Sequence, residues 1–139
     1  MSADSSGNGY NLTIGSGQWQ TGYSGYGIQS NTINGTPYAG NLGTGVLTNY
    51  TWMFWVYRTG TVGSYGQVIY DSANFWFELW NTNVLSVNVG IQTPPLDLNT
   101  WTHIALTRSG NTYTFFVNGS SVATNTTPNS DYDLDRSRP

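Results

Sequence analysis

The sequence predicts an all-β fold, a two-sheet antiparallel sandwich or jelly roll, and three observations support this prediction. Short runs of alternating apolar and polar residues recur, whereas no segment keeps apolar residues at helical spacing for three turns. The runs are spaced roughly 8 to 12 residues apart, as in sandwiches and jelly rolls. The chain has 17 Gly, six Trp and ten Tyr, a composition that suits short strands joined by tight turns.

Nine strands are expected, separated by connectors that contain Gly, Asn, Ser or Pro. They cover residues 10–14, 25–29, 50–58, 67–71, 75–80, 84–89, 101–107, 112–117 and 120–125. Residues 97–100 are expected to form one helical turn or a loop.

The expected strand at 50–58 is apolar on both of its faces. One row consists of Tyr50, Trp52, Phe54 and Val56, and the other of Met53, Trp55 and Tyr57. Such a pattern predicts a strand that is buried on both sides. Exposure of either row would create an apolar patch that needs a partner.

Residues 99–125 predict two consecutive hairpins. The first turns at Ser109-Gly110-Asn111, and the second turns at Asn118-Gly119. An Asn-Gly pair between strand-like runs is a strong hairpin signal, because both residues accept the positive φ of a type I′ turn.

Three motifs resemble those of laminin-G-like, concanavalin-A-type jelly-roll domains, and they occur in the family's order. Asp4-Ser-Ser-Gly-Asn8 resembles the family's opening motif. Tyr50-Thr-Trp-Met-Phe-Trp-Val-Tyr57 resembles its Phe-Thr-hydrophobic-x-Phe-Trp-Val strand. Trp101-Thr-His-Ile-Ala105 with Phe115-Phe-Val-Asn-Gly119 resembles its penultimate strands. The resemblance covers about residues 4–127 and implies the same concanavalin A-like, laminin G-like fold, but it says little about a ligand.

We expect one domain over residues 1–127 and a flexible tail with acidic and basic residues over 128–139. Relatives of this type usually add a closing strand, which the sequence after Thr127 does not show. A missing strand would leave backbone donors and acceptors unpaired on its neighbour. Three alternatives are open: the tail replaces the closing strand, another chain supplies it, or the domain is a minimal version of the family fold that lacks it.

Charge and composition exclude several classes of function. The net charge is −3 and lysine is absent, so no basic footprint for nucleic acid or an anionic membrane exists. No apolar run is long enough for a transmembrane helix, so membrane insertion is not expected. The absence of Cys excludes disulfides and thiolate metal sites. No signal peptide is visible, and we expect an extracellular or virion-surface location, reached as a mature form or through virion assembly.

Residues 75–89 split by parity into two faces. Phe75, Phe77, Leu79, Leu85, Val87 and Val89 form the expected core face. The opposite face carries Trp76, Glu78 and Trp80, with Ser86 and Asn88 across the ladder. Indoles can stack on pyranose C–H faces while Glu and Asn bond to hydroxyls, so this face suits a sugar. Tyr65 and Tyr38 are candidate rim aromatics, and a second core layer or a subunit interface is the alternative interpretation.

No catalytic residue is assigned, and an enzyme is not expected. Glycoside hydrolases commonly use two carboxylates about 5 to 10 Å apart. Laminarinase-like enzymes share the architecture implied by the resemblance and carry Glu-x-Asp-x-x-Glu on one strand. Here Glu78 is the only glutamate, and only Asp71 could approach it from the preceding strand. His103 is the only histidine. The sequence contains no Gly-x-Ser-x-Gly elbow to supply a nucleophile for it and no further nitrogen or sulfur ligands for a zinc site, so we expect His103 to be structural.

Calcium is the candidate cofactor, because domains of the resembled type often bind Ca²⁺ at a loop rim. Asp4 and Asn8 match the family's opening motif, and Asp71 is a third candidate ligand. Carboxylate and amide oxygens are the ligands that Ca²⁺ prefers. A structural turn is the alternative for these residues.

The sequence therefore predicts a non-catalytic recognition or adhesion module whose leading partner is a glycan or surface glycoconjugate. The alternative is a structural decoration or fibre protein of a virion, on a phage capsid or tail. Such a protein would act through oligomeric contacts with copies of itself or with other virion proteins. Fold alone cannot choose between these functions, because function depends on the site.

Overall fold

The computed structural model describes residues 5–9, 11–13, 18–29, 38–39, 46–60, 67–71, 75–80, 82–127 and 134–135. The chain forms two compact units, one over residues 46–134 and one over residues 1–45 with 135–139. Each unit is described by itself. No helix that could span a membrane occurs in these described ranges.

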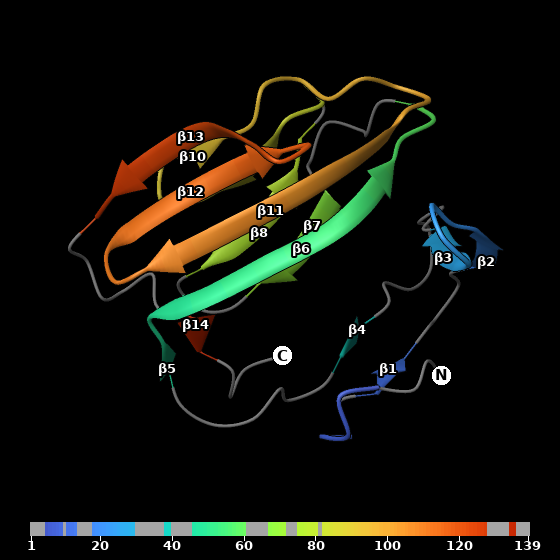
Figure 1. The fold of residues 1–139 in the computed structure, drawn as a ribbon, viewed down its shortest axis with the longest axis horizontal. Coiled ribbons are helices and arrows are strands. Elements are labelled where there is room, and N and C mark those ends of the chain that lie inside the picture. The colour runs from blue at the N-terminus through green and yellow to red at the C-terminus, as the bar shows by residue number, and fades with distance from the viewer. Residues whose placement is uncertain are drawn as a thin grey trace. The chain divides into compact units, whose positions relative to one another are not determined.

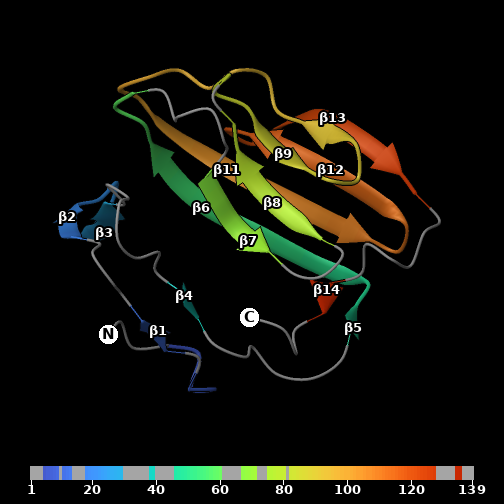
Figure 2. The same ribbon diagram turned by 180° about the vertical axis from the view of Figure 1, so that it is seen from behind.

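The larger unit is a sandwich of two four-stranded antiparallel sheets. Figure 1 shows one sheet in front, which we call the long sheet, and Figure 2 shows the other, the short sheet, from behind. The long sheet has the order β13 (Ser120–Thr126), β12 (Thr112–Val117), β11 (Trp101–Ser109) and β6 (Asn49–Tyr57). The short sheet has the order β10 (Ile91–Gln92), β9 (Leu85–Val87), β8 (Trp76–Leu79) and β7 (Gln67–Asp71). The predicted all-β, two-sheet antiparallel class is confirmed.

Aromatic rings from both sheets fill the space between them. The Phe77 ring lies 5.8 Å from Phe54 and 5.6 Å from Phe115, and Phe75 stacks on Tyr113 at 6.3 Å. Offset and tilted arrangements at such distances are the favourable ones for aromatic pairs. The buried core is completed by Leu79, Leu85, Val87, Val89, Ile91, Leu96, Ile104 and Leu106. The predicted inward row of residues 75–89 is therefore confirmed.

Both predicted hairpins of the long sheet are present. In the second, Asn118 has φ of 50° and Gly119 has φ of 82°, as a type I′ turn requires. The Asn118 side chain also contributes, since its Oδ1 accepts a 2.9 Å hydrogen bond from the His103 N–H. This polar residue thus ties β11 to the turn that follows β12.

Strand segments occur at all nine predicted positions, including β1 (Leu12–Thr13) and β3 (Tyr26–Gln29). Five further short strands were not predicted: β2 (Gln18–Thr21), β4 (Tyr38–Ala39), β5 (Val46–Leu47), β10 and β14 (Leu134–Asp135). Residues 97–100 form a turn without helix. β14 pairs with β5 in a two-stranded sheet.

The prediction that residues 50–58 are buried on both sides is wrong for one row. Tyr50, Trp52, Phe54 and Val56 pack against the core, as expected. Met53, Trp55 and Tyr57 are 70%, 42% and 43% exposed. The physical reason is that the sandwich of the larger unit has two layers, and within it β6 faces the second layer on one side only.

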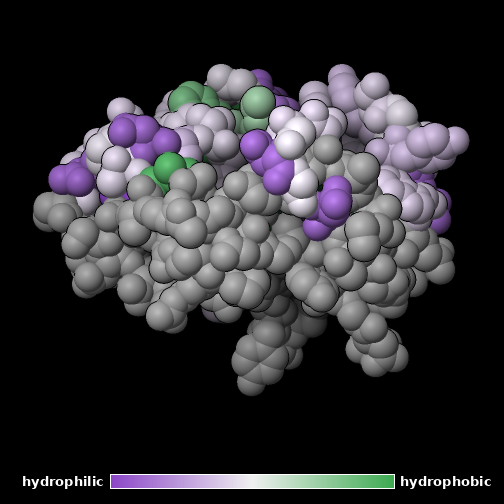
Figure 3. Space-filling model, turned by 90° about the horizontal axis from the view of Figure 1, so that it is seen from below, coloured by the Kyte–Doolittle hydropathy of each residue, from purple (hydrophilic) through white to green (hydrophobic). Residues whose placement is uncertain are grey.

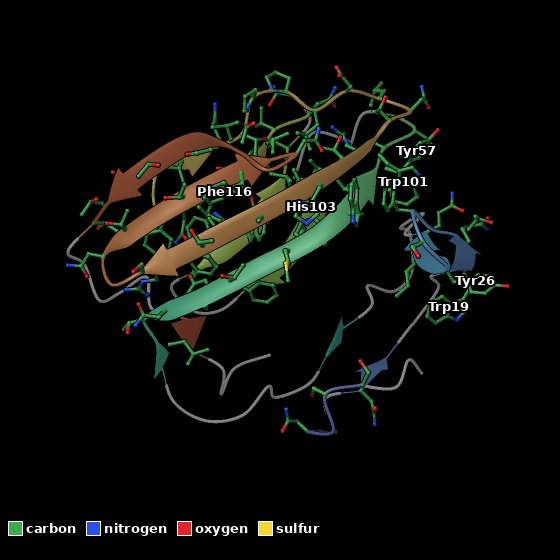
Figure 4. The ribbon with its side chains drawn as sticks, in the orientation of Figure 1. Trp19, Tyr26, Tyr57, Trp101, His103 and Phe116 are labelled. Carbon is green, nitrogen blue, oxygen red and sulfur yellow. The ribbon has the colours of Figure 1, made fainter. Side chains whose placement is uncertain are left out.

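The smaller unit contains two separate strand pairs. β1 pairs with β4, and β2 pairs with β3 in a hairpin. Gly22 is required at the hairpin turn, because a Cβ there would lie 2.9 Å from the Tyr26 carbonyl carbon. Trp19 and Tyr26, labelled in Figure 4, are exposed on this hairpin.

Candidate functional site

The outer side of the short sheet carries the row that the sequence predicted as a binding face. Trp76 and Trp80 are 40% and 39% exposed, and Glu78 between them is half-buried. Residues two apart on a strand are separated by about 7 Å, so the two indoles flank the carboxylate at that spacing along the strand. We call Trp76, Glu78, Trp80, Ser86 and Gln92 the indole face.

Strand register sets the polar part of the indole face. Glu78 is paired with Ser86, and Ser86 is paired with Gln92 on the next strand. Paired residues of an antiparallel ladder lie on one side of the sheet with Cβ atoms about 5 Å apart. A carboxylate, a hydroxyl and an amide therefore form one row across three strands, beside the two indoles.

Asn88 holds the first residue of β8 in place. Its Oδ1 accepts a 3.2 Å hydrogen bond from the Trp76 N–H, and its own N–H donates to the Trp76 carbonyl at 3.4 Å. The side chain that was predicted to contact a ligand thus binds the backbone of the neighbouring strand. Through these bonds Asn88 positions Trp76, and its contact with a ligand stays a prediction.

A tight turn fixes Trp80 at the other end of the row. The Trp80 N–H donates to the Val84 carbonyl at 2.9 Å, and the Trp80 carbonyl accepts from the Asn83 N–H at 3.0 Å. Asn83 adopts a φ of 66°, which Asn tolerates better than most residues. Both indoles are therefore attached to backbone that is fixed by hydrogen bonds.

Neither described arginine lies on an outer face. Arg108 is buried, donates from Nε to the Gly110 carbonyl at 2.8 Å, and lies 5.0 Å from the Tyr113 ring centroid. Arg58 is also buried, and its Nη2 donates to the Gly60 carbonyl at 3.0 Å. Burial lowers the pKa of Arg58. Within the described ranges, the indole face therefore has no cation to attract an anionic ligand.

The remaining predicted residues are only partly described. Asp71 is the register partner of Trp76 on β7, and only its backbone is described. Tyr65 and Asp4 lie outside the described residues. Asn8 is exposed in a turn, where its Nδ2 donates to Ser6 Oγ at 3.0 Å. The described residues contain no group of three or more His, Asp or Glu that could hold a metal ion, and calcium binding stays a prediction.

Two residues beside the row were missed by sequence reasoning. Gln92 joins the indole face because β10 pairs with β9 after the turn at Gly90, whose φ is 82°. Ile69 is exposed on β7 at an irregularity between Val68 and Tyr70. Gly90 was the available signal for a hairpin, whereas a single-residue irregularity has no signature in the sequence.

The two packed antiparallel sheets define a β-sandwich domain of the concanavalin A type. A family model for laminin G domains, described as the concanavalin A-like lectin/glucanases superfamily, matches residues 29–138, and the chain belongs to this family. The resemblance seen in the sequence is thereby confirmed. No curated protein and no solved structure matches the chain.

Family membership supports a general class of function. Laminin G-like domains are typically non-catalytic binding modules, although the superfamily also includes glycosidases. The match includes residues 128–138, which were predicted to form a tail. The domain boundary at residue 127 stays a prediction.

Proposed function

We propose that this protein is a recognition module that binds neutral glycans on the indole face. The observation that carries the proposal is the row of Trp76 and Glu78 on β8 with Trp80 directly after the strand, with both indoles exposed. Aromatic rings offer flat apolar surface to sugar C–H groups, and a few convergent polar groups fix the orientation. Both components are present within one short sheet.

Charge narrows the ligand class. Glu78 is the ionisable group at the centre of the indole face, and the two described arginines are buried elsewhere. A carboxylate accepts hydrogen bonds from sugar hydroxyls but repels sulfate, phosphate and sialic acid groups. Neutral hexose-containing glycans are therefore favoured over anionic ones.

A glycan array with the full-length protein tests this proposal. Wild type should bind neutral glycans, and the Trp76→Ala/Trp80→Ala variant should lose that binding with an unchanged circular dichroism spectrum. Running the array with and without EDTA tests calcium at the same time, since a calcium-dependent site loses its ligand on chelation. Binding that survives removal of both indoles contradicts the proposal.

Glu78→Gln separates binding from catalysis. For a recognition module, the variant should bind more weakly and neither protein should release reducing sugar. A glycosidase that uses Glu78 would instead show turnover in the wild type that the variant loses while retaining its ligand.

The second candidate is a structural protein of a virion that acts through oligomeric contacts. The exposed row of β6 favours it, because a large apolar patch on a sheet face needs a partner. A chain that forms stable oligomers and binds no glycan on the array would support this candidate over the first.

A further inference from the structure

The outer side of the long sheet carries a second surface, distinct from the indole face. Three cross-strand rows form it: Tyr57 beside Trp101, Trp55 beside His103, and Met53 beside Ala105 and Phe116. The Tyr57 and Trp101 rings lie 5.2 Å apart, and Trp55 meets His103 edge-on at 5.1 Å. Figure 4 shows Tyr57 and Trp101 near one end of β6 and β11, His103 further along β11, and Phe116 on β12. We call these seven residues the aromatic face.

The aromatic face continues into a polar end on the same sheet. Two further cross-strand rows contain Thr51, Thr107, Thr114 and Thr124, and then Asn49, Ser109, Thr112 and Thr126. The Thr114 and Thr124 hydroxyls are hydrogen-bonded to each other, as are those of Thr112 and Thr126. None of these side chains is Asp, Glu, Lys or Arg.

We propose that the aromatic face is the contact through which two copies of this chain associate face to face. Trp, Tyr, Phe and Met are enriched in the cores of protein interfaces, whereas charged residues are depleted there. Met53, at 70%, has the largest exposed fraction among the described residues of β6 and β11 given a value. It is an apolar side chain with little to offer a sugar hydroxyl but well suited to a packed protein contact.

Charge favours a second copy over other partners. The chain carries a net charge of −3, so two copies repel each other over most of their surface. In the described strands, the outer side of the long sheet carries no Asp, Glu, Lys or Arg and has His103 as its imidazole, so copies can meet there without contact between carboxylates. The same lack of charge offers nothing to a strongly acidic or basic partner or to an anionic membrane.

The symmetry of a dimer is compatible with this surface. A two-fold axis in the plane of the interface, running along the strands, places aromatic rows on aromatic rows and threonine rows on threonine rows. Two sheets packed this way lie about 10 Å apart with their strands about 30° from alignment.

The area available predicts a weak dimer. Each residue of an antiparallel sheet covers about 16 Å², from a rise of about 3.4 Å and a strand spacing of about 4.8 Å. The four strands contain 9, 9, 6 and 7 residues, so their outer face covers about 500 Å². Two copies would bury about 1,000 Å², the lower limit for a specific interface, so we expect a dissociation constant in the micromolar range.

Kyte–Doolittle hydropathy is a poor guide to this surface. Figure 3 views the molecule from below, perpendicular to the face-on view of the long sheet, and its coloured residues are mostly pale or purple with a few green groups. Trp and Tyr rank slightly on the hydrophilic side of this scale, so a surface built from them does not appear green. Ring contacts and exposed fractions identify the aromatic face where hydropathy alone does not.

Sedimentation velocity of the full chain over a concentration series tests the proposal. The mass should rise with concentration from the 15.2 kDa monomer towards twice that value. Met53→Glu brings two carboxylates to the dimer contact and should weaken association by about tenfold or more. Ile69→Glu adds the same charge to the exposed surface of the opposite sheet and should leave association unchanged.

A monomer at every concentration overturns the proposal, as does equal weakening by the two variants. Loss of glycan binding in Met53→Glu, with glycan binding intact in the Trp76→Ala/Trp80→Ala variant, would make the aromatic face a sugar site and overturn both proposals. Association does not depend on the indole face, so a failure to bind glycans leaves this proposal standing. Unchanged thermal melting of Met53→Glu is the control for folding.

Discussion

The two outer surfaces of the sandwich are built from the same kind of alternating strand, yet their chemistry differs. The indole face combines two tryptophans with a carboxylate, a hydroxyl and an amide in one row. The aromatic face combines rings, including the His103 imidazole, with methionine and alanine and has no Asp, Glu, Lys or Arg. If both proposals hold, the spacing of polar groups among the rings, rather than aromatic content alone, distinguishes a ligand-binding surface from a protein contact.

The positions of the two faces also predict how a dimer would present its indole faces. The indole face and the aromatic face lie on opposite sheets of the larger unit. A dimer formed through the aromatic faces would therefore display its two indole faces outward, in opposite directions. Such a dimer could bridge two glycan-bearing surfaces, and attachment would gain avidity without any new contact.

The largest expected effect is a loss of stability on mutation of the hydrophobic core, which lies between the two sheets that carry the two surfaces. Phe77→Ala should lower the free energy of unfolding by about 3–5 kcal/mol, because it removes a fully buried ring of the short sheet that packs against Phe54 and Phe115 of the long sheet. The adjacent Trp76→Ala truncates a side chain on the opposite side of β8 and should cost much less. Urea denaturation of the two variants measures the difference, and equal losses would contradict the assigned parity of this strand.

The next largest effect is a loss of stability on removal of a buried hydrogen bond to β9, the strand that carries Ser86 of the indole face. Thr93 is buried, and its Oγ1 accepts a 3.0 Å hydrogen bond from the Leu85 N–H. Thr93→Val leaves this N–H without its acceptor and should cost about 1–3 kcal/mol. Thr93→Ser retains the hydroxyl and is the matched control, so a similar loss in both variants would point to packing instead.

A smaller effect distinguishes positioning from ligand contact at Asn88. Asn88→Ala removes the acceptor for the Trp76 N–H and should cost about 1 kcal/mol of stability. If Asn88 acts only by positioning Trp76, Asn88→Asp should preserve glycan affinity, since its carboxylate also accepts this bond. Calorimetric titration of both variants decides, and loss of affinity in Asn88→Asp as well as in Asn88→Ala would indicate direct contact through the amide.

The smallest expected effect is on the pH dependence of stability, and it arises from Tyr50 on the inner side of β6. Burial, with a smaller contribution from Tyr113, raises the pKa of Tyr50. In the unfolded chain Tyr50 ionises near pH 10, while the folded chain keeps it protonated, so this contribution to stability is present below about pH 10 and falls above it. Tyr50→Phe should therefore lose less stability than wild type on going from about pH 9 to pH 11, measured by urea denaturation. Identical pH profiles would contradict the burial of this hydroxyl.

The sequence predicted the fold better than it predicted which faces are covered. Period-two alternation correctly assigned Phe77 to the core and Trp76 to the opposite face, and Asn118-Gly119 correctly predicted a type I′ turn. The same reasoning failed at β6, because alternation shows which residues share a face but not whether another layer lies on it. Met53 is as apolar as a core residue, and only its exposure shows where it lies.

The candidate site could be predicted in part for similar reasons. Trp76, Glu78 and Trp80 follow from parity within one strand, which is a local property. The role of Asn88 depends on its hydrogen bond to a neighbouring strand, and the inclusion of Gln92 depends on β10 pairing with β9. Such cross-strand relations are set by register, which a single sequence specifies only weakly for strands of two or three residues.

The central claim is that glycan binding belongs to the indole face and not to the aromatic face. Its most direct test is calorimetric titration of an array-selected neutral glycan into Trp76→Ala/Trp80→Ala and, as a matched control, Trp55→Ala, whose indole is equally exposed on the opposite sheet. We predict wild-type affinity per site in Trp55→Ala and no measurable binding in the double variant. Loss of binding in Trp55→Ala with binding retained in the double variant would contradict the account.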